Sequence, residues 1–117
     1  MYEKHVVGKL GEEIAEKYLT QNNYKIIEKN FSCSFGEIDI IAKDEEEIVI
    51  IEVKTRTNKN YGLPIDSVTK IKQKHMKKAA EFYLNIRGFE NENIRIDVIE
   101  IYIKNNKCYV HHIKQIW

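Results

Sequence analysis

The chain has 117 residues, with 19 basic and 18 acidic side chains and a net charge of +1 at pH 7. This balance excludes a uniformly basic, histone-like protein, and the content of 43% hydrophobic and 32% charged residues excludes a disordered chain. No apolar run is long enough to span a membrane, so we expect no membrane contact. The two isolated cysteines have no CxxC spacing, and the first residues lack the apolar centre of a signal peptide. We therefore expect one cytoplasmic domain over residues 1–117 with reduced thiols.

A helix is expected over residues 2–21, because four apolar residues recur there at spacings of three or four. These residues are Val7, Leu10, Ile14 and Tyr18. A second face of this helix carries small residues around Glu12, namely Gly8, Gly11 and Ala15. A helix with such a face can approach another backbone closely. On this pattern alone, Glu12 is expected to be an ordinary exposed helix acid.

Three strands are expected next, over residues 24–30, 37–43 and 48–56. The third begins with four consecutive β-branched residues at 48–51, which is typical of a strand buried on both faces in the middle of a sheet. The acidic residues 44–47 join the second and third strands as an exposed hairpin turn. The third strand should therefore be antiparallel to the second and central in the sheet.

A second helix is expected after a loop over residues 58–65, with Asp66 or Ser67 as its N-cap and its end near Ile86. Its buried face is predicted to carry Val68, Ile71, Ala79, Phe82 and Ile86. Its lysines should lie largely away from that face. Strands over residues 94–103 and 108–113 follow. The order of the elements indicates an α/β fold with a central mixed sheet flanked by helices.

The positive charge gathers in one part of the sequence. The window from Val53 to Lys78 holds eight basic residues and one acid, Asp66, so it carries a net charge of +7 and the rest of the chain −6. Such a patch on one side of a near-neutral protein can bind a polyanion such as nucleic acid. A solvated lysine-rich helix face would have the same composition.

The most informative motifs are GEID at 36–39 and EVK at 52–54. Side chains two residues apart in a strand point to the same face. Glu37 and Asp39 should therefore share one face of their strand, and Glu52 and Lys54 one face of theirs. Charged residues on a strand that is otherwise core are unfavourable unless a site uses them. Carboxylates that converge from adjacent strands suit Mg²⁺ or Mn²⁺, and Lys54 could stabilise charge on a phosphate. Salt bridges at the rim of the sheet are the alternative interpretation.

This arrangement resembles the PD-(D/E)xK nuclease superfamily, which includes restriction endonucleases and archaeal Holliday-junction resolvases. Nearly the whole chain is similar to the YraN-like family of small bacterial predicted endonucleases. The matching segments are GKLGEEIAEKYL at 8–19, GEIDIIA at 36–42, IEVKTR at 51–56, SVTKIKQ at 67–73, AAEFYL at 79–84 and RIDVI at 95–99. The resemblance implies a restriction-endonuclease-like αβββαβ core.

The resemblance also implies roles for individual residues. Asp39 and Glu52 match the two metal-binding acids, Lys54 the signature lysine, and Glu12 a glutamate that approaches the metal from a helix. Glu37 would be a further ligand or a partner of Lys54. Arg56, Lys72 and Gln73 match positions that look like phosphate contacts. With the lysines of the basic window, the expected nucleic-acid-binding set is Arg56, Lys59, Lys70, Lys72, Gln73, Lys74 and Lys78.

The leading functional hypothesis is a Mg²⁺- or Mn²⁺-dependent nuclease that acts on DNA rather than RNA, including branched or structured DNA. A domain of this size covers little duplex, so cutting both strands would require a homodimer or a larger DNA-processing machinery. The main alternative is a non-catalytic nucleic-acid-binding or assembly module on the same fold. A structural protein with rim ion pairs is a third. His111 and His112 should face opposite sides of a strand, so we expect them to be surface and rim residues rather than ligands of a shared ion.

Overall fold

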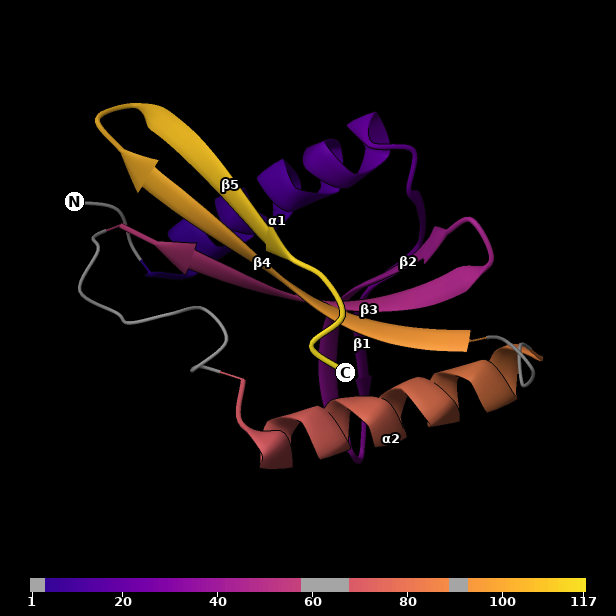
Figure 1. The fold of residues 1–117 in the computed structure, drawn as a ribbon. Helices are drawn as coiled ribbons and strands as arrows, with labels where there is room; N and C mark the ends of the chain where they lie inside the picture. Colours follow the sequence, from indigo (N-terminus) through magenta and orange to yellow (C-terminus); the bar gives the residue numbers. More distant parts are fainter. Residues whose placement is uncertain (1–3, 58–67, 89–92) are drawn as a thin grey trace.

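The computed structural model describes residues 4–57, 68–88 and 93–117 (Figure 1). Its elements in chain order are α1 (Lys4–Gln21), β1 (Lys25–Cys33), β2 (Gly36–Asp44), β3 (Glu47–Arg56), α2 (Lys70–Arg87), β4 (Asn93–Lys104) and β5 (Lys107–Ile113). The predicted mixed α/β fold with an αβββαβ order is confirmed, and the last predicted strand is present as β5. Neither helix in the described parts of the chain is long and apolar enough to cross a membrane.

The five strands form one mixed sheet in the order β1-β2-β3-β4-β5. Neighbouring strands are antiparallel except β3 and β4, which are parallel and are connected through α2. The predicted central position of β3 is confirmed, since it lies between β2 and β4. A parallel pair needs a crossover connection, and α2 fills that role.

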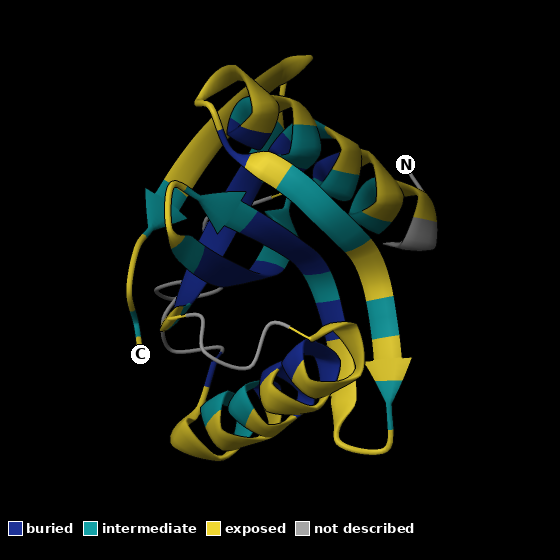
Figure 2. Cartoon of the chain, turned by 90° about the vertical axis from the view of Figure 1, so that its right-hand side faces the viewer, coloured by how far each residue is buried: buried dark blue, intermediate teal, exposed yellow. Residues whose placement is uncertain are grey.

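Each face of the sheet is covered by one helix (Figure 2). Alternate residues of β3 supply the two cores: Val49 and Ile51 pack with residues of α1, and Ile48 and Ile50 pack with residues of α2. All four side chains are at most 1% exposed. The run of β-branched residues thus forms the centre of both cores, as the sequence predicts.

Helix α1 lies close to the sheet through its small-residue face. Gly11 is buried and Ala15 is fully buried, whereas Leu10 is 40% exposed. A Cβ atom at Gly11 would stand 1.8 Å from Thr55 Oγ1 and 2.9 Å from Thr55 Cβ, so a side chain cannot fit there without a shift. A Cβ atom at Gly8 would meet no described atom within 4 Å, so within the described residues the close approach rests on Gly11 and not on Gly8.

Helix α2 begins later than predicted. Thr69 is its N-cap, with Oγ1 accepting a hydrogen bond from Lys72 N at 3.1 Å. Asp66 and Ser67, the predicted caps, lie outside the described residues. Gly88, with φ of 76°, ends the helix in the left-handed conformation that glycine adopts without strain.

The buried face of α2 is rotated from the predicted one. Val68 and Ala79 are buried as expected, but Ile71, Phe82 and Ile86 are 68%, 41% and 57% exposed. The residues that face the sheet are Met76, Ala79, Ala80, Tyr83 and Leu84. Two apolar stripes overlap on this helix, and contact with the sheet selects the stripe that the prediction did not choose.

A buried polar network lies between α1, the strand β4 and the edge strand β5. Arg95 binds both carboxylate oxygens of Asp97 at 2.9 and 3.0 Å, and His112 Nε2 lies 2.6 Å from Asp97 Oδ2. Burial acts to raise the pKa of Asp97, but the hydrogen bonds from His112 and Arg95 lower it below its ordinary value. The side chain of His112 is only 5% exposed, so its expected surface position is wrong, whereas His111 is exposed.

The close contact of α1 with β3 makes Gly11 and Gly8 a matched pair for a stability test. Gly11→Ala should lower the free energy of unfolding by about 1–2 kcal/mol, because overpacking against Thr55 outweighs the gain of about 1 kcal/mol in helix propensity. Gly8→Ala should raise the free energy of unfolding by up to about 1 kcal/mol, since only the helix propensity changes. Urea denaturation of both variants measures the difference. Equal stability of the two variants would contradict the close contact.

Candidate functional site

The candidate site lies where the central strands β2 and β3 separate. Their pairing runs from Asp44–Glu47 to Ile40–Ile51 and ends there. Beyond that point β2 remains paired with β1, and β3 remains paired with β4. Asp39 and Glu52 are the first residues past the last pair, one on each strand. We call this opening the strand fork.

The strand fork is bridged by a side chain instead of a ladder hydrogen bond. Val53 N donates to Asp39 Oδ2 at 2.8 Å. This bond satisfies a backbone N–H that faces the opening, and it fixes the carboxylate of Asp39 beside Glu52. The predicted approach of the GEID and EVK motifs is thus present in the structure.

Two lysines from different elements meet the buried carboxylate of Glu52. Glu52 Oε1 lies 2.8 Å from Lys72 Nζ of α2 and 3.4 Å from Lys54 Nζ of the same strand. The Glu52 side chain is 9% exposed, so these ion pairs are only weakly screened by solvent. Burial acts to lower the pKa of Lys72, but its hydrogen bond with Glu52 and the charge of Glu52 raise it, which keeps the lysine charged.

The carboxylates at the strand fork affect one another's ionisation. Burial, followed by the charge of Glu52, raises the pKa of Asp39 from 3.8 to about 6, although the hydrogen bond from Val53 opposes the shift. Burial also raises the pKa of Glu12, with the charges of Glu52 and Glu37 adding to the effect. Glu12 projects from α1 directly after Gly11, so the close contact with Thr55 places it there. Glu37 is exposed, with Ser32 Oγ 3.4 Å from its Oε1.

The donor chemistry of the strand fork fits a hard divalent cation. Its ligands would be carboxylate oxygens, and Asp39 is a partly buried carboxylate close enough to Glu52 for that charge to raise its pKa. No group of three or more His, Cys, Asp or Glu side chains within the described residues is arranged to hold a metal ion. Mg²⁺ typically binds only one or two protein carboxylates and keeps several water ligands, so Asp39 and Glu52 remain adequate donors.

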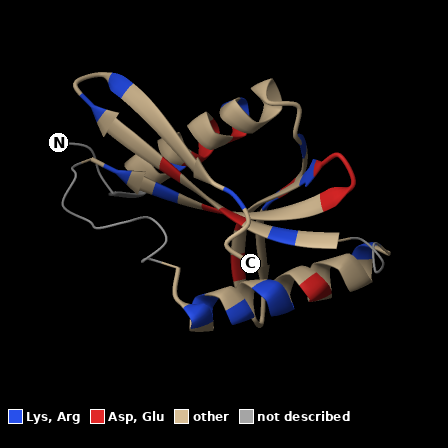
Figure 3. Ribbon diagram, viewed as in Figure 1, with Lys and Arg blue, Asp and Glu red and all other residues tan. Residues whose placement is uncertain are grey.

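Some of the predicted nucleic-acid contacts are exposed in the structure, and others are bonded to residues of the protein itself. Lys70, Lys74 and Lys78 are exposed on α2, where basic residues gather (Figure 3). Lys72 instead points to Glu52. Lys59 lies outside the described residues.

Two other predicted contacts are held within the fold. Gln73 Nε2 donates to the backbone oxygen of Val68 at 3.0 Å, which secures the start of α2. Arg56 Nε lies 3.2 Å from Glu100 Oε2, and the Arg56 side chain is 13% exposed. Little of the Arg56 guanidinium therefore faces outward in this conformation.

Comparison with known proteins places the chain in a family. The model of the "Uncharacterised protein family UPF0102" matches residues 11–101. The chain belongs to the UPF0102 family. UPF0102 is the YraN-like family that the sequence resembles, so the predicted membership in that family is confirmed.

Relatives in the UPF0102 family align with nearly the whole chain. The "UPF0102 protein TTE1452" of Caldanaerobacter subterraneus subsp. tengcongensis is 43% identical over 97% of this chain and 93% of its own. The "UPF0102 protein" of Clostridium beijerinckii is 44% identical over 92% of this chain and 89% of its own. A solved structure titled "Crystal structure of SSO0001" covers 97% of this chain and 53% of its own, at 20% identity and a TM-score of 0.41. A likeness that weak supports no inference.

The sequence of this UPF0102 protein gives no sign that Lys72 contacts Glu52, because the two residues lie on separate elements with a loop between them. It also gives no sign of the small cavity beside the strand fork that Phe35, His75 and Met76 help to line. The one available signal was Gly36, since a glycine in a strand pattern often marks a place where a ligand or another backbone approaches closely.

The raised pKa of Asp39 gives a pH-dependent stability test. Since its folded-state pKa of about 6 exceeds the ordinary 3.8, the charged form opposes folding, and stability is lost as the pH rises through about 6. Asp39→Asn should therefore be more stable than the parent above pH 6, by up to about 3 kcal/mol, with the difference closing below about pH 4. Urea denaturation across this pH range measures it. Glu46→Gln, which removes an exposed carboxylate of the β2–β3 turn, should change little at any pH.

Proposed function

We propose that this UPF0102 protein is a metal-dependent nuclease that hydrolyses phosphodiester bonds in DNA. The observation that supports this best is the meeting of Asp39 and Glu52 at the strand fork, beside Lys54. Burying carboxylates between strands inside a sheet costs free energy, which is unfavourable unless a site uses their charge. The αβββαβ order is also the one that the resemblance to PD-(D/E)xK nucleases implies.

In the proposed mechanism, Asp39 and Glu52 would hold Mg²⁺ or Mn²⁺. The bound cation would polarise the phosphate and lower the pKa of water. Lys54 stabilises the negative charge that grows on the phosphate oxygens. Glu12, whose pKa burial raises, is suited to accept a proton from the attacking water, because a carboxylate with a raised pKa is a stronger base.

The exposed lysines of α2 would hold the DNA backbone beside this site. Lys70, Lys74 and Lys78 lie on the same helix as Lys72, which reaches Glu52. Contacts of this kind bind phosphates without reading the base sequence. One such domain would cut one strand, so a homodimer or a larger DNA-processing machinery would be needed to cut both.

A second candidate function is a non-catalytic nucleic-acid-binding module. The ion pairs of Glu52 with both Lys54 and Lys72 favour it, because they already neutralise a carboxylate that the nuclease needs for a metal. In this case the strand fork would be a closed structural charge cluster. DNA would then bind to the lysines without being cut.

Glu52→Gln and Lys54→Ala separate the two functions. Glu52→Gln keeps the side-chain size and removes a metal ligand, so it should abolish Mn²⁺ binding measured by calorimetry. Lys54→Ala should keep metal binding. Both should lower cleavage of single-stranded, flapped or branched DNA by roughly 10²–10³-fold, because each removes an electrostatic contribution to the transition state. Glu46→Gln serves as the matched control and should behave as the parent.

The outcomes distinguish the candidates. A parent that binds DNA but cuts no substrate with Mg²⁺ or Mn²⁺ would favour the binding module. Cleavage that persists equally in Glu52→Gln and Lys54→Ala would show that the activity does not belong to the strand fork.

Salt dependence tests the lysine surface of α2. Replacing Lys70, Lys74 and Lys78 together by Gln should reduce the slope of log affinity against log salt by about 2–3 units, since each lost phosphate contact removes about 0.9 for duplex DNA. Fluorescence anisotropy over a salt series measures the slope. A control triple variant at Lys104, Lys107 and Lys114 removes the same charge from the β4–β5 side and should keep the slope. If both triple variants reduce the slope by the same amount, the DNA-binding surface is not confined to α2.

A further inference from the structure

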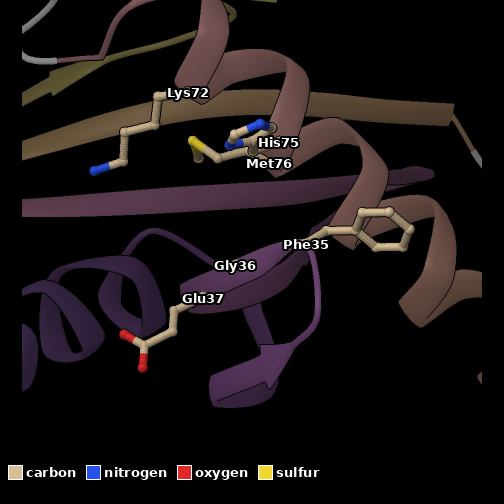
Figure 4. A pocket seen from close by; sticks show the side chains of 6 residues that line it. All are labelled: Phe35, Gly36, Glu37, Lys72, His75 and Met76. Carbon is tan, nitrogen blue, oxygen red and sulfur yellow. The ribbon is translucent and has the colours of Figure 1, made fainter.

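A cavity of about 150 Å³ lies beside the strand fork, between the start of β2 and the first half of α2 (Figure 4). Its lining residues are Phe35, Gly36, Glu37, Lys72, His75 and Met76. Lys72 connects it to the site, because the same side chain lies 2.8 Å from Glu52. Glu37 stands two residues before Asp39. A group held in this cavity would therefore lie next to a phosphate at the strand fork.

The lining suits a flat ring with polar edges. Phe35 is 41% exposed, with its ring edge-on to Phe82 at a centroid distance of 6.4 Å. Met76 and His75 add a polarisable thioether and a second ring, and thioethers make favourable contacts with aromatic rings. An aromatic and a histidine ring are typical of proteins that stack unpaired bases.

Gly36 leaves the cavity open from the strand side. Its φ of 133° is one that other residues rarely adopt, and a Cβ there would meet no described atom within 4 Å. The residue thus combines a conformation that requires glycine with bare backbone at the wall of the cavity. Glycine with these properties allows a ligand to approach the backbone closely.

We propose that this cavity holds one unpaired nucleobase of DNA, directly beside the phosphate that lies at the strand fork. The inference rests on the proposed function and names its substrate class: single-stranded DNA, or DNA with unpaired nucleotides such as a flap. Bases within a duplex are stacked on one another and cannot enter such a cavity. The cavity is also smaller than the roughly 300–1,000 Å³ of pockets for drug-sized ligands, so it accommodates a single base and not a stack. Lys72 at its border supplies a cation for the adjoining phosphate.

The test measures binding without metal, so that it does not depend on cleavage. Phe35→Ala and His75→Ala are compared with the parent for a single-stranded oligonucleotide and the matching blunt duplex, by fluorescence anisotropy in EDTA. Both variants should lose about 5- to 100-fold in affinity for the single strand, which is the range for one lost stacking contact, and keep their affinity for the duplex. Tyr109→Ala is the control, because Tyr109 is 55% exposed on β5, at the opposite edge of the sheet from β1. It should change neither affinity.

A set of oligonucleotides with a single abasic site locates the base. The parent should lose affinity when the abasic site falls at one position, and Phe35→Ala should lose no more there, because the contact is already absent. Circular dichroism checks that each variant is folded, and His75→Ala serves if Phe35→Ala unfolds. Losses that are equal for single strand and duplex, or no loss in either variant, would overturn the inference while leaving the nuclease proposal intact. A parent that binds no DNA would overturn both.

Discussion

The hydrogen bond from Val53 N to the carboxylate of Asp39 is the interaction on which the strand fork depends. Beyond the Ile40–Ile51 pair, the N–H of Val53 no longer has a backbone partner on β2. Leaving a fully buried donor unpaired costs about 1–3 kcal/mol, and the N–H of Val53 is partly buried. A carboxylate replaces the missing carbonyl, so β2 and β3 can separate without that loss. The same bond holds one acid of the candidate site in place, and the opening it permits is where Glu52 becomes accessible to Lys72.

The fully buried Asp97 and the partly buried Asp39 differ in how their surroundings balance their charge. Asp97 accepts hydrogen bonds from Arg95, His112 and Gln115 N, and its pKa falls despite burial. Asp39 faces Glu52 and Glu12, and its pKa rises to about 6 because burial and repulsion outweigh the bond from Val53. The fold could have neutralised Asp39 with an arginine, as it neutralises Asp97. Perturbed pKa values of this kind are frequent at functional sites, although structural ion-pair networks produce them too.

The sequence predicts those parts of the fold that follow from local periodicity. The β-branched run at 48–51 indicated a central strand, and the period of two, combined with a short acidic turn, predicted that GEID and EVK would meet. The face of α2 was not predictable in this way, because Ile71, Phe82 and Ile86 form a stripe as regular as that of Met76 and Tyr83, and only the sheet selects between them. His112 posed a similar problem. Strand alternation separates it from His111, but its burial depends on coverage by Tyr18 of α1.

The crossover from β3 to β4 places a basic helix beside the acidic strand fork. In a parallel pair the connecting helix returns along the sheet, so the first turn of α2 lies toward the end of β3. This topology brings Lys72 to Glu52, although 20 residues separate them in the chain. It also directs the positive end of the helix dipole and the exposed Lys70 and Lys74 toward the same end of the sheet. Carboxylates alone would repel a phosphate backbone. The lysines of α2 offset that repulsion, so the helix that the parallel connection requires would also let the proposed nuclease site accept DNA.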